Sequence, residues 1–441
     1  MDATASLSGL RILVVGINYA PEHTGIAPYT TQACRVLAGA GAGVYVLSGL
    51  PHYPHWNVPA EYRGRIHTDE LDGPVRVRRL RHHVPGKQSA LTRSAYELSF
   101  GLHVLGQRLP WRPDVVIAVI PSLLGAAAAG RLAAKASAPL VLWVQDLMGA
   151  AAGQSGIAGG GRISRVTHAI EAHTIKQAAA VVVVSDAFRA SVRAAGASED
   201  RIHHVPNWVH VDAPTRDRAA TRARLGWRDD EVVALHSGNM GLKQGLENVV
   251  EAARLAGTAA TGLRFVLMGD GSQREALADL GAGVAGLQML PPAAHEDFPN
   301  VLAAADILLV NERGSAVNMS LPSKLTSYFG TSRPVVAAIP STGGTAAEIR
   351  RSGGGLLVSP DDPRALLEAI AKLATDPETR SALGKAGAAH AQAHLTAEAS
   401  LSRLSEVLVD VLPRVAQAAS AAPQASSALG SSNTRRCRVP R

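Results

Sequence analysis

The sequence predicts an α/β protein whose parallel sheets are wrapped by helices and divided between two domains. Short apolar runs repeatedly lead into glycine-rich turns, and apolar residues at helical spacing follow those turns. The clearest example is VVALHSGNMGLKQGLENVVEAA, residues 232–253. The length of 441 residues is sufficient for two domains of ordinary size. We therefore expect strand, turn and helix to recur through both halves.

Composition narrows the class of protein. Apolar residues make up 46% of the chain and charged residues 18%, as in a globular protein. The two cysteines, Cys34 and Cys437, do not form a disulfide framework and fit a reducing cytosol. The start MDATASLSG lacks the basic and apolar regions of a signal peptide. The longest apolar run, 115–130, contains Pro121 and is expected to be a strand and a helix rather than a membrane span.

The net charge of +8 favours an anionic partner. Nucleic acid is not expected, because neither zinc-ligand spacing nor an aromatic RNA-binding motif accompanies the charge. An anionic membrane surface or a phosphorylated lipid fits better.

The first half opens with a predicted βαβ unit. A strand at 11–15 leads into a loop at 16–25, a helix at about 27–40 and a strand at 43–48. The glycines of this loop do not have the G-x-G-x-x-G spacing of a dinucleotide site.

The segment HYPHW, residues 52–56, follows the second strand. Its two histidines could suggest a metal, but no carboxylate or cysteine stands nearby in the sequence to complete a site. We favour a ligand-binding loop, because open α/β sheets bind ligands at the carboxyl ends of their strands.

A basic segment spans residues 63–112, with ten Lys/Arg against four Asp/Glu, a net charge of +6. A helix is predicted at 89–109, with leucines at 91, 98, 102, 105 and 109 on roughly one face. One interpretation is a basic surface beside an ordinary core-facing helix. The interpretation we favour is a patch that binds an anionic membrane surface. Its densest charges are Arg76, Arg78, Arg79 and Arg81.

Further strands are predicted at 114–120, 139–144 and 180–185. Asp146 follows the second of these strands and should face the ligand-binding edge of the sheet, which makes it a candidate polar residue of the site. The first domain is expected to end near 212, with a hinge at 212–217.

The turn at 236–245 has the chemistry of a diphosphate site. Gly238 and Gly241 allow close backbone approach, Lys243 adds a charge, and the following helix offers unpaired N–H groups. An ordinary turn with a solvated lysine is the alternative.

Three more strand–turn–helix units follow, at 265–277, 305–328 and 333–345. With the strings SGNMGLKQGLENVVEAA, PSKLTSYFGTSRPVVAA and PNW, the succession resembles a family 4 glycosyltransferase, of the branch that builds colanic-acid-like exopolysaccharides. The resemblance implies the GT-B fold: two Rossmann-like, doubly wound parallel-sheet domains facing a central cleft. It divides the chain into an acceptor domain (1–212), a nucleotide-sugar domain (213–377) and helices that cross back (378–415). Residues 416–441 are rich in Ala, Ser and Gln and end in a basic run, which predicts a disordered tail.

The resemblance also implies the activity: retaining transfer of a sugar from a GDP- or UDP-sugar to a lipid-linked or saccharide acceptor, by a cytoplasmic enzyme peripheral to the inner membrane face. No cofactor beyond the nucleotide-sugar co-substrate is expected. Asp146, Lys243 and Lys324 are the candidate catalytic residues. The candidate donor-binding residues are Gly25, Gly238, Asn239, Lys243, Pro322, Ser323, Lys324 and Ser327.

The sequence departs from the family pattern at several positions. Two glutamates usual in family 4 are replaced by Met319 and Ser327, and Glu312 is out of register with both. The ribose-binding role would then fall to Ser327. The chain has no Asp-x-Asp pair, which agrees with a metal-independent reaction in which Lys243 and Lys324 neutralise the leaving group. A nucleotide-sugar 2-epimerase and a non-catalytic sugar-nucleotide-binding paralogue remain the alternatives.

Overall fold

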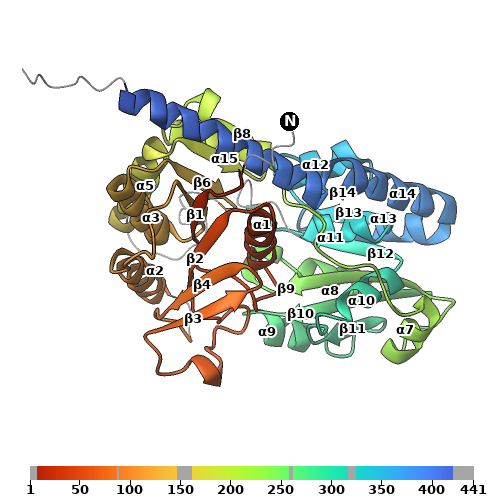
Figure 1. Cartoon of the computed structure of the whole chain (residues 1–441). Coiled ribbons are helices and arrows are strands. Elements are labelled where there is room, and N and C mark those ends of the chain that lie inside the picture. Colours follow the sequence, from red (N-terminus) through yellow and green to blue (C-terminus); the bar gives the residue numbers. More distant parts are fainter. Residues whose placement is uncertain (1–6, 87–88, 147–160, 258–261, 316–323, 421–441) are drawn as a thin grey trace, which may run out of the picture.

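The computed structural model describes residues 7–86, 89–146, 161–257, 262–315 and 324–420. Two α/β units, each built on its own sheet, lie side by side (Figure 1). The predicted fold class is confirmed, with one exception: the outermost strand of the first sheet is antiparallel to its neighbour.

The first sheet has eight strands in the order β3-β4-β2-β1-β5-β6-β7-β8. Its central strands are continuous apolar runs buried on both faces, as helix-covered parallel strands require. The hairpin of β3 and β4 falls in the basic segment, where no strand was predicted. The strands are β1 (Arg11–Val15), β2 (Gly43–Gly49), β3 (His67–Asp72), β4 (Val75–Leu80), β5 (Val115–Ile120), β6 (Leu140–Val144), β7 (Ala180–Val183) and β8 (Ile202–His204).

Helices cover this sheet and enclose its apolar core. They are α1 (Ala27–Gly39), α2 (Ala90–Leu105), α3 (Leu123–Ala136), α5 (Gly161–Gln177) and α6 (Arg189–Ala194), with 3-10 turns at Ala60–Tyr62, Asp186–Phe188 and Glu199–Arg201.

The second sheet has six strands in the order β11-β10-β9-β12-β13-β14, and every neighbouring pair is parallel. All six strands therefore end at one edge of the sheet, which is where an open α/β sheet places its ligand. The strands are β9 (Val232–Asn239), β10 (Leu263–Asp270), β11 (Leu287–Leu290), β12 (Ile307–Asn311), β13 (Val335–Ala338) and β14 (Gly355–Val358).

Two apolar clusters cover the two faces of this sheet. The surrounding helices are α7 (Arg218–Leu225), α8 (Glu247–Ala256), α9 (Arg274–Leu280), α10 (Phe298–Ala304), α11 (Lys324–Gly330), α12 (Gly344–Ser352), α13 (Pro363–Thr375) and α14 (Pro377–His394), with a 3-10 turn, η5, at Leu242–Gln244.

The last helix, α15 (Ala397–Ser420), returns to the first unit and crosses it in blue at the top of Figure 1. Leu401, Leu404 and Leu408 join the core of the first sheet. The helix continues through residues 416–420, so these five residues are not part of a disordered tail; residues 421–441 lie outside the described residues.

The chain passes between the two units twice, once after β8 and once between α14 and α15. The two connections touch: the amide of Val209 donates a hydrogen bond of 2.9 Å to the carbonyl of Leu395.

Candidate active site

Lys324 and Gly238 meet at the carboxyl edge of the second sheet. Gly238 has a φ of +122°, and a Cβ on it would lie 3.8 Å from the Lys324 ammonium nitrogen. The amine therefore lies against glycine backbone, where a ligand can also approach. Strand β9 continues to Asn239, so the turn predicted at 236–245 begins four residues later than the first apolar run suggested. Gly238 and Asn239 are both exposed at its end.

Lys243 is exposed on the turn η5, and the neighbouring end of β12 holds that turn in place. The amide of Arg313 donates to the Lys243 carbonyl at 2.9 Å. The Asn311 side chain donates to the carbonyls of Gln244 and Gly245, at 2.6 and 2.9 Å. Lys243 thus extends from a fixed backbone on the same edge of the sheet as Lys324.

Glu312 is the site residue that the sequence analysis set aside. It directly follows β12, is half-buried, and receives a hydrogen bond of 3.4 Å from the Thr345 hydroxyl. Burial raises the pKa of its carboxyl to about 7, against the opposing effects of Lys324 and Lys243. The sequence does contain a signal for Glu312: it is an acidic residue just after a buried strand, which is the pattern that predicts Asp146 as a site residue.

Lys324 has a perturbed pKa of its own. Burial lowers the pKa of its ammonium to about 8, and the charge of Glu312 acts in the opposite direction. The two groups therefore change charge close to neutrality, as groups at binding and catalytic sites often do. Burial, and then the charge of Lys324, hold the pKa of His236 well below its usual value, so this imidazole is neutral.

Of the remaining predicted residues in this half, Ser327 is buried, with 4% of its surface exposed. Its neighbour Tyr328 accepts a hydrogen bond of 2.9 Å from the Ser237 amide, which ties α11 to β9. Pro322, Ser323 and Met319 lie outside the described residues.

The loop that carries Gly25 meets the start of α11 across the two units. Gly25 has a φ of +66°, and a Cβ on it would lie 3.3 Å from the Tyr53 ring. Four residues later, the Tyr29 hydroxyl is 3.2 Å from the hydroxyl of Thr326, two residues beyond Lys324. The structure thus brings the loop of Gly25 and the helix of Lys324 to one interface.

Asp146 is half-buried and lies two residues after the end of β6. Its neighbour Gln145 accepts a hydrogen bond of 2.8 Å from the Asn207 amide group, which fixes the end of this strand against the segment that leaves the first unit.

The HYPHW segment is packed into a polar and aromatic cluster. One ring nitrogen of His52 is 2.9 Å from the Leu50 carbonyl and the other is 3.1 Å from the Tyr96 hydroxyl. The Glu22 carboxylate accepts from the amides of His52 and Tyr53, at 2.8 and 2.9 Å. Within the described residues, no three His, Cys, Asp or Glu side chains gather where they could hold a metal ion.

The four arginines predicted to form one exposed patch, Arg76, Arg78, Arg79 and Arg81, are not all available to bind a membrane. Arg79 is buried and pairs with Glu70 at 2.7 Å, while Arg78 pairs with Asp69 at 2.6 Å. These two arginines hold the β3–β4 hairpin together. Arg76 remains exposed and lines a hollow together with Arg108.

The leucine face of α2 points away from the core. The buried apolar side chains of this helix are Tyr96, Phe100 and Val104, and the carboxyl of Glu97 is buried beside them. No helix within the described ranges has the length and apolar character needed to cross a bilayer. The exposed leucines are Leu91 (78%), Leu98 (53%), Leu102 (56%) and Leu105 (42%).

Comparison with known proteins accounts for both units. Residues 24–208 match the family described as a glycosyl transferase 4-like domain, and residues 231–376 match glycosyl transferases group 1. The chain is 33% identical over 334 residues to WcaI of Escherichia coli (strain K12), a protein named as a glycosyl transferase of colanic acid biosynthesis; the match covers 73% of this chain and 81% of WcaI.

Solved structures share the fold. The sucrose-phosphate synthase of Thermosynechococcus elongatus superposes with a TM-score of 0.69 at 18% identity, covering 93% of this chain and all of that one. HepE of Anabaena, solved in complex with UDP-glucose, gives a TM-score of 0.62 at 15% identity, covering 93% and 99%. The chain therefore belongs to the family 4 glycosyltransferases of the GT-B fold, and it is a glycosyltransferase.

Proposed function

We propose that the enzyme moves a sugar, with retention of anomeric configuration, from a UDP- or GDP-sugar to a lipid-linked or saccharide acceptor in exopolysaccharide assembly. The observation that carries the donor half is the meeting of Lys243, Lys324 and Gly238 at one sheet edge. The binding of UDP-glucose by HepE supports a nucleotide-sugar donor, and the name of WcaI supports the polysaccharide context.

In this proposal the two lysines bind the diphosphate and stabilise the charge that develops on the leaving group. Glycine backbone at Gly238 and Gly25 lets the donor approach closely. Asn239 contributes to the donor site from the end of β9, Ser327 contacts the ribose, and Pro322 and Ser323, which directly precede Lys324 in the sequence, complete the donor-binding set. Asp146 contacts the acceptor from the other side.

Glu312 gives the site a titratable partner for Lys324. When protonated, its carboxyl can donate a hydrogen bond to the donor; when ionised, it competes with the diphosphate for the lysines. The state of Glu312 thus sets how much positive charge the donor meets.

Donor binding should accordingly weaken as pH rises from about 6 to about 9. Over this interval Glu312, with a pKa of about 7, gains a negative charge, and Lys324, with a pKa of about 8, loses its positive charge. Loss of charge-assisted contacts should lower UDP affinity about tenfold or more. Calorimetric titration with UDP at several pH values between 6 and 9 tests whether affinity falls as pH rises. Glu312→Gln should remove the part of the fall that occurs around pH 7. Affinity that is constant with pH would contradict it.

Turnover should survive chelation, because the lysines supply the positive charge that a metal would otherwise bring to the leaving group. Release of UDP or GDP is measured with and without EDTA. A loss of activity that a divalent ion restores would show that the two lysines do not suffice.

A panel of UDP- and GDP-sugars, each with and without a polyprenyl-diphosphate-linked acceptor, tests the whole proposal. Acceptor-dependent release of nucleotide supports transfer. Isomerisation of the sugar would support the 2-epimerase alternative, for which Glu312 supplies the cleft acid that the Met319 and Ser327 positions lack. Binding without turnover would support a non-catalytic role.

The leucine face of α2 supports the membrane part of the proposal. Four exposed leucines form an apolar strip along one side of α2, and the exposed Arg108 follows Leu105 by three residues. An anionic membrane surface matches both features, because leucines can insert at the acyl boundary while arginines meet lipid headgroups. We propose that this strip holds the enzyme at the inner membrane face, close to a lipid-linked acceptor.

A further inference from the structure

A second polar pocket lies at the opposite edge of the second sheet from Lys324. It has a volume of about 450 Å³, within the range of small-molecule sites. Asp306 lies directly before β12 and Pro334 directly before β13, so the pocket opens at the amino ends of these strands. Helix α11, about 10 Å long, begins at Lys324 and ends at Gly330, directly before the pocket's Thr331.

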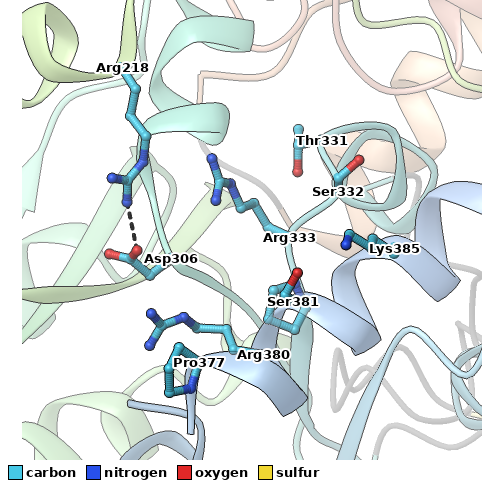
Figure 2. Close-up of a pocket in the computed structure, with 10 residues that line it drawn as sticks. Arg218, Asp306, Thr331, Ser332, Arg333, Pro377, Arg380, Ser381 and Lys385 are labelled. Carbon is cyan, nitrogen blue, oxygen red and sulfur yellow. Dashed lines mark hydrogen bonds and ion pairs between the residues drawn. The ribbon is translucent and has the colours of Figure 1, made fainter. Parts of the chain in front are cut away.

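The pocket is rich in positive charge. Figure 2 shows Arg218, Arg333 and Arg380 directed toward the side where Asp306 lies, with Lys385 across from them. Asp306 is the only carboxylate among the lining residues. The lining is completed by polar side chains and prolines: Thr331, Ser332, Pro334, Pro377 and Ser381.

Asp306 does not balance this charge, because its oxygens already have partners. Arg218 donates to one oxygen at 2.6 Å. The buried Arg222 and the Val233 amide donate to the other, at 3.1 and 2.9 Å. The single negative charge of Asp306 is thus shared by Arg218 and Arg222. The positive charges of Arg333, Arg380 and Lys385 are additional to these.

Arg333 is the most poorly compensated of these cations. One terminal nitrogen donates to the Ala303 carbonyl at 2.8 Å, while its buried Nε has no hydrogen-bond partner within the described residues. Burial lowers its pKa, and the neighbouring charge of Arg218 acts in the same direction. A cation held in this way is stabilised when an anion binds beside it.

We propose that this pocket binds a phosphate-bearing small molecule at a site separate from the donor cleft. Guanidinium groups present paired N–H donors that match phosphate oxygens, and Lys385 adds a point charge at the rim. The hydroxyls of Thr331, Ser332 and Ser381 offer further hydrogen bonds. The phosphate binds beside Arg333 and Arg380, whose guanidinium groups do not pair with Asp306.

Isothermal titration calorimetry tests the proposal: the full chain is titrated with inorganic pyrophosphate in 0.15 M NaCl. We expect two binding events. Lys385→Gln combined with Arg380→Gln should weaken one of them about tenfold or more and leave the other unchanged. Lys243→Ala should affect only the other, so failure of the proposed donor site and failure of this pocket give different results.

Controls separate charge from folding. Lys372→Gln, an exposed lysine on α13 outside the lining set, should leave both events unchanged. Arg380 also donates to the carbonyls of Leu373 and Ala374, so the exposed Lys385 is tested alone as well, with the melting temperature of each variant. A single binding event that the pocket variants leave unaltered would overturn the proposal.

Discussion

Replacing Lys324 by alanine is expected to weaken UDP or GDP binding by about ten- to a hundredfold, the equivalent of one charge-assisted contact. Lys243→Ala should have a similar effect, and the double variant should reduce binding below the range of calorimetric titration. The reason is that both amines serve one diphosphate from one edge of the sheet. Lys324→Ala also removes the cation that offsets the half-buried Glu312 carboxyl, so the pKa of Glu312 should rise further.

The matched control is Lys372→Ala, which removes an exposed lysine from α13 without touching this edge. Dissociation constants for UDP and GDP that are unchanged in Lys324→Ala would remove this residue from the donor site. Unchanged dissociation constants in Lys243→Ala would show that Lys243 is a solvated residue on an ordinary turn and does not bind the diphosphate.

Changing Leu91, Leu98 and Leu102 together to serine is expected to lower binding to anionic vesicles about a hundredfold or more. A fully buried leucine contributes about 1.5–3 kcal/mol, so even partial insertion of three side chains sums to about 3 kcal/mol. All three are exposed in the structure, so the change should leave folding intact. Co-sedimentation with phosphatidylserine vesicles measures the effect.

The control for this experiment is Leu255→Ser, an exposed leucine on α8 in the other unit. Arg76→Ser with Arg108→Ser should cause a smaller, salt-sensitive loss of about 1 kcal/mol for each arginine. Arg79 is left unchanged, because its replacement would break the buried pair with Glu70. Equal sedimentation of parent and leucine variant would show that α2 does not contact the membrane.

The fold was predictable because its strands are locally conspicuous. Runs such as 115–120 are apolar throughout, and a buried parallel strand needs nothing else to be recognised. The β3–β4 hairpin was missed for the converse reason. Its charges look like a solvated surface until pairing sets Arg78 opposite Asp69.

The site residues in the turn after a strand were predictable from the sequence. A residue that had to be identified by its alignment with the family pattern was not. Lys243 and Gly238 stand in a recognisable turn. Glu312 was set aside because it does not align with the family's glutamates, although its distance from Lys324 in space is independent of that alignment. Periodicity also could not say which face of α2 is buried, since Leu98 and Phe100 are equally apolar in sequence.

The paired connections at Val209 and Leu395 make the enzyme resistant to separation by a single cut. If a protease cleaves the first connection, the second still joins the sheets, and α15 remains anchored by its leucines in the first core. A nicked chain should therefore migrate as two fragments on a denaturing gel yet elute as one particle in native chromatography. Release of the second unit should require a second cut, in the connection between α14 and α15.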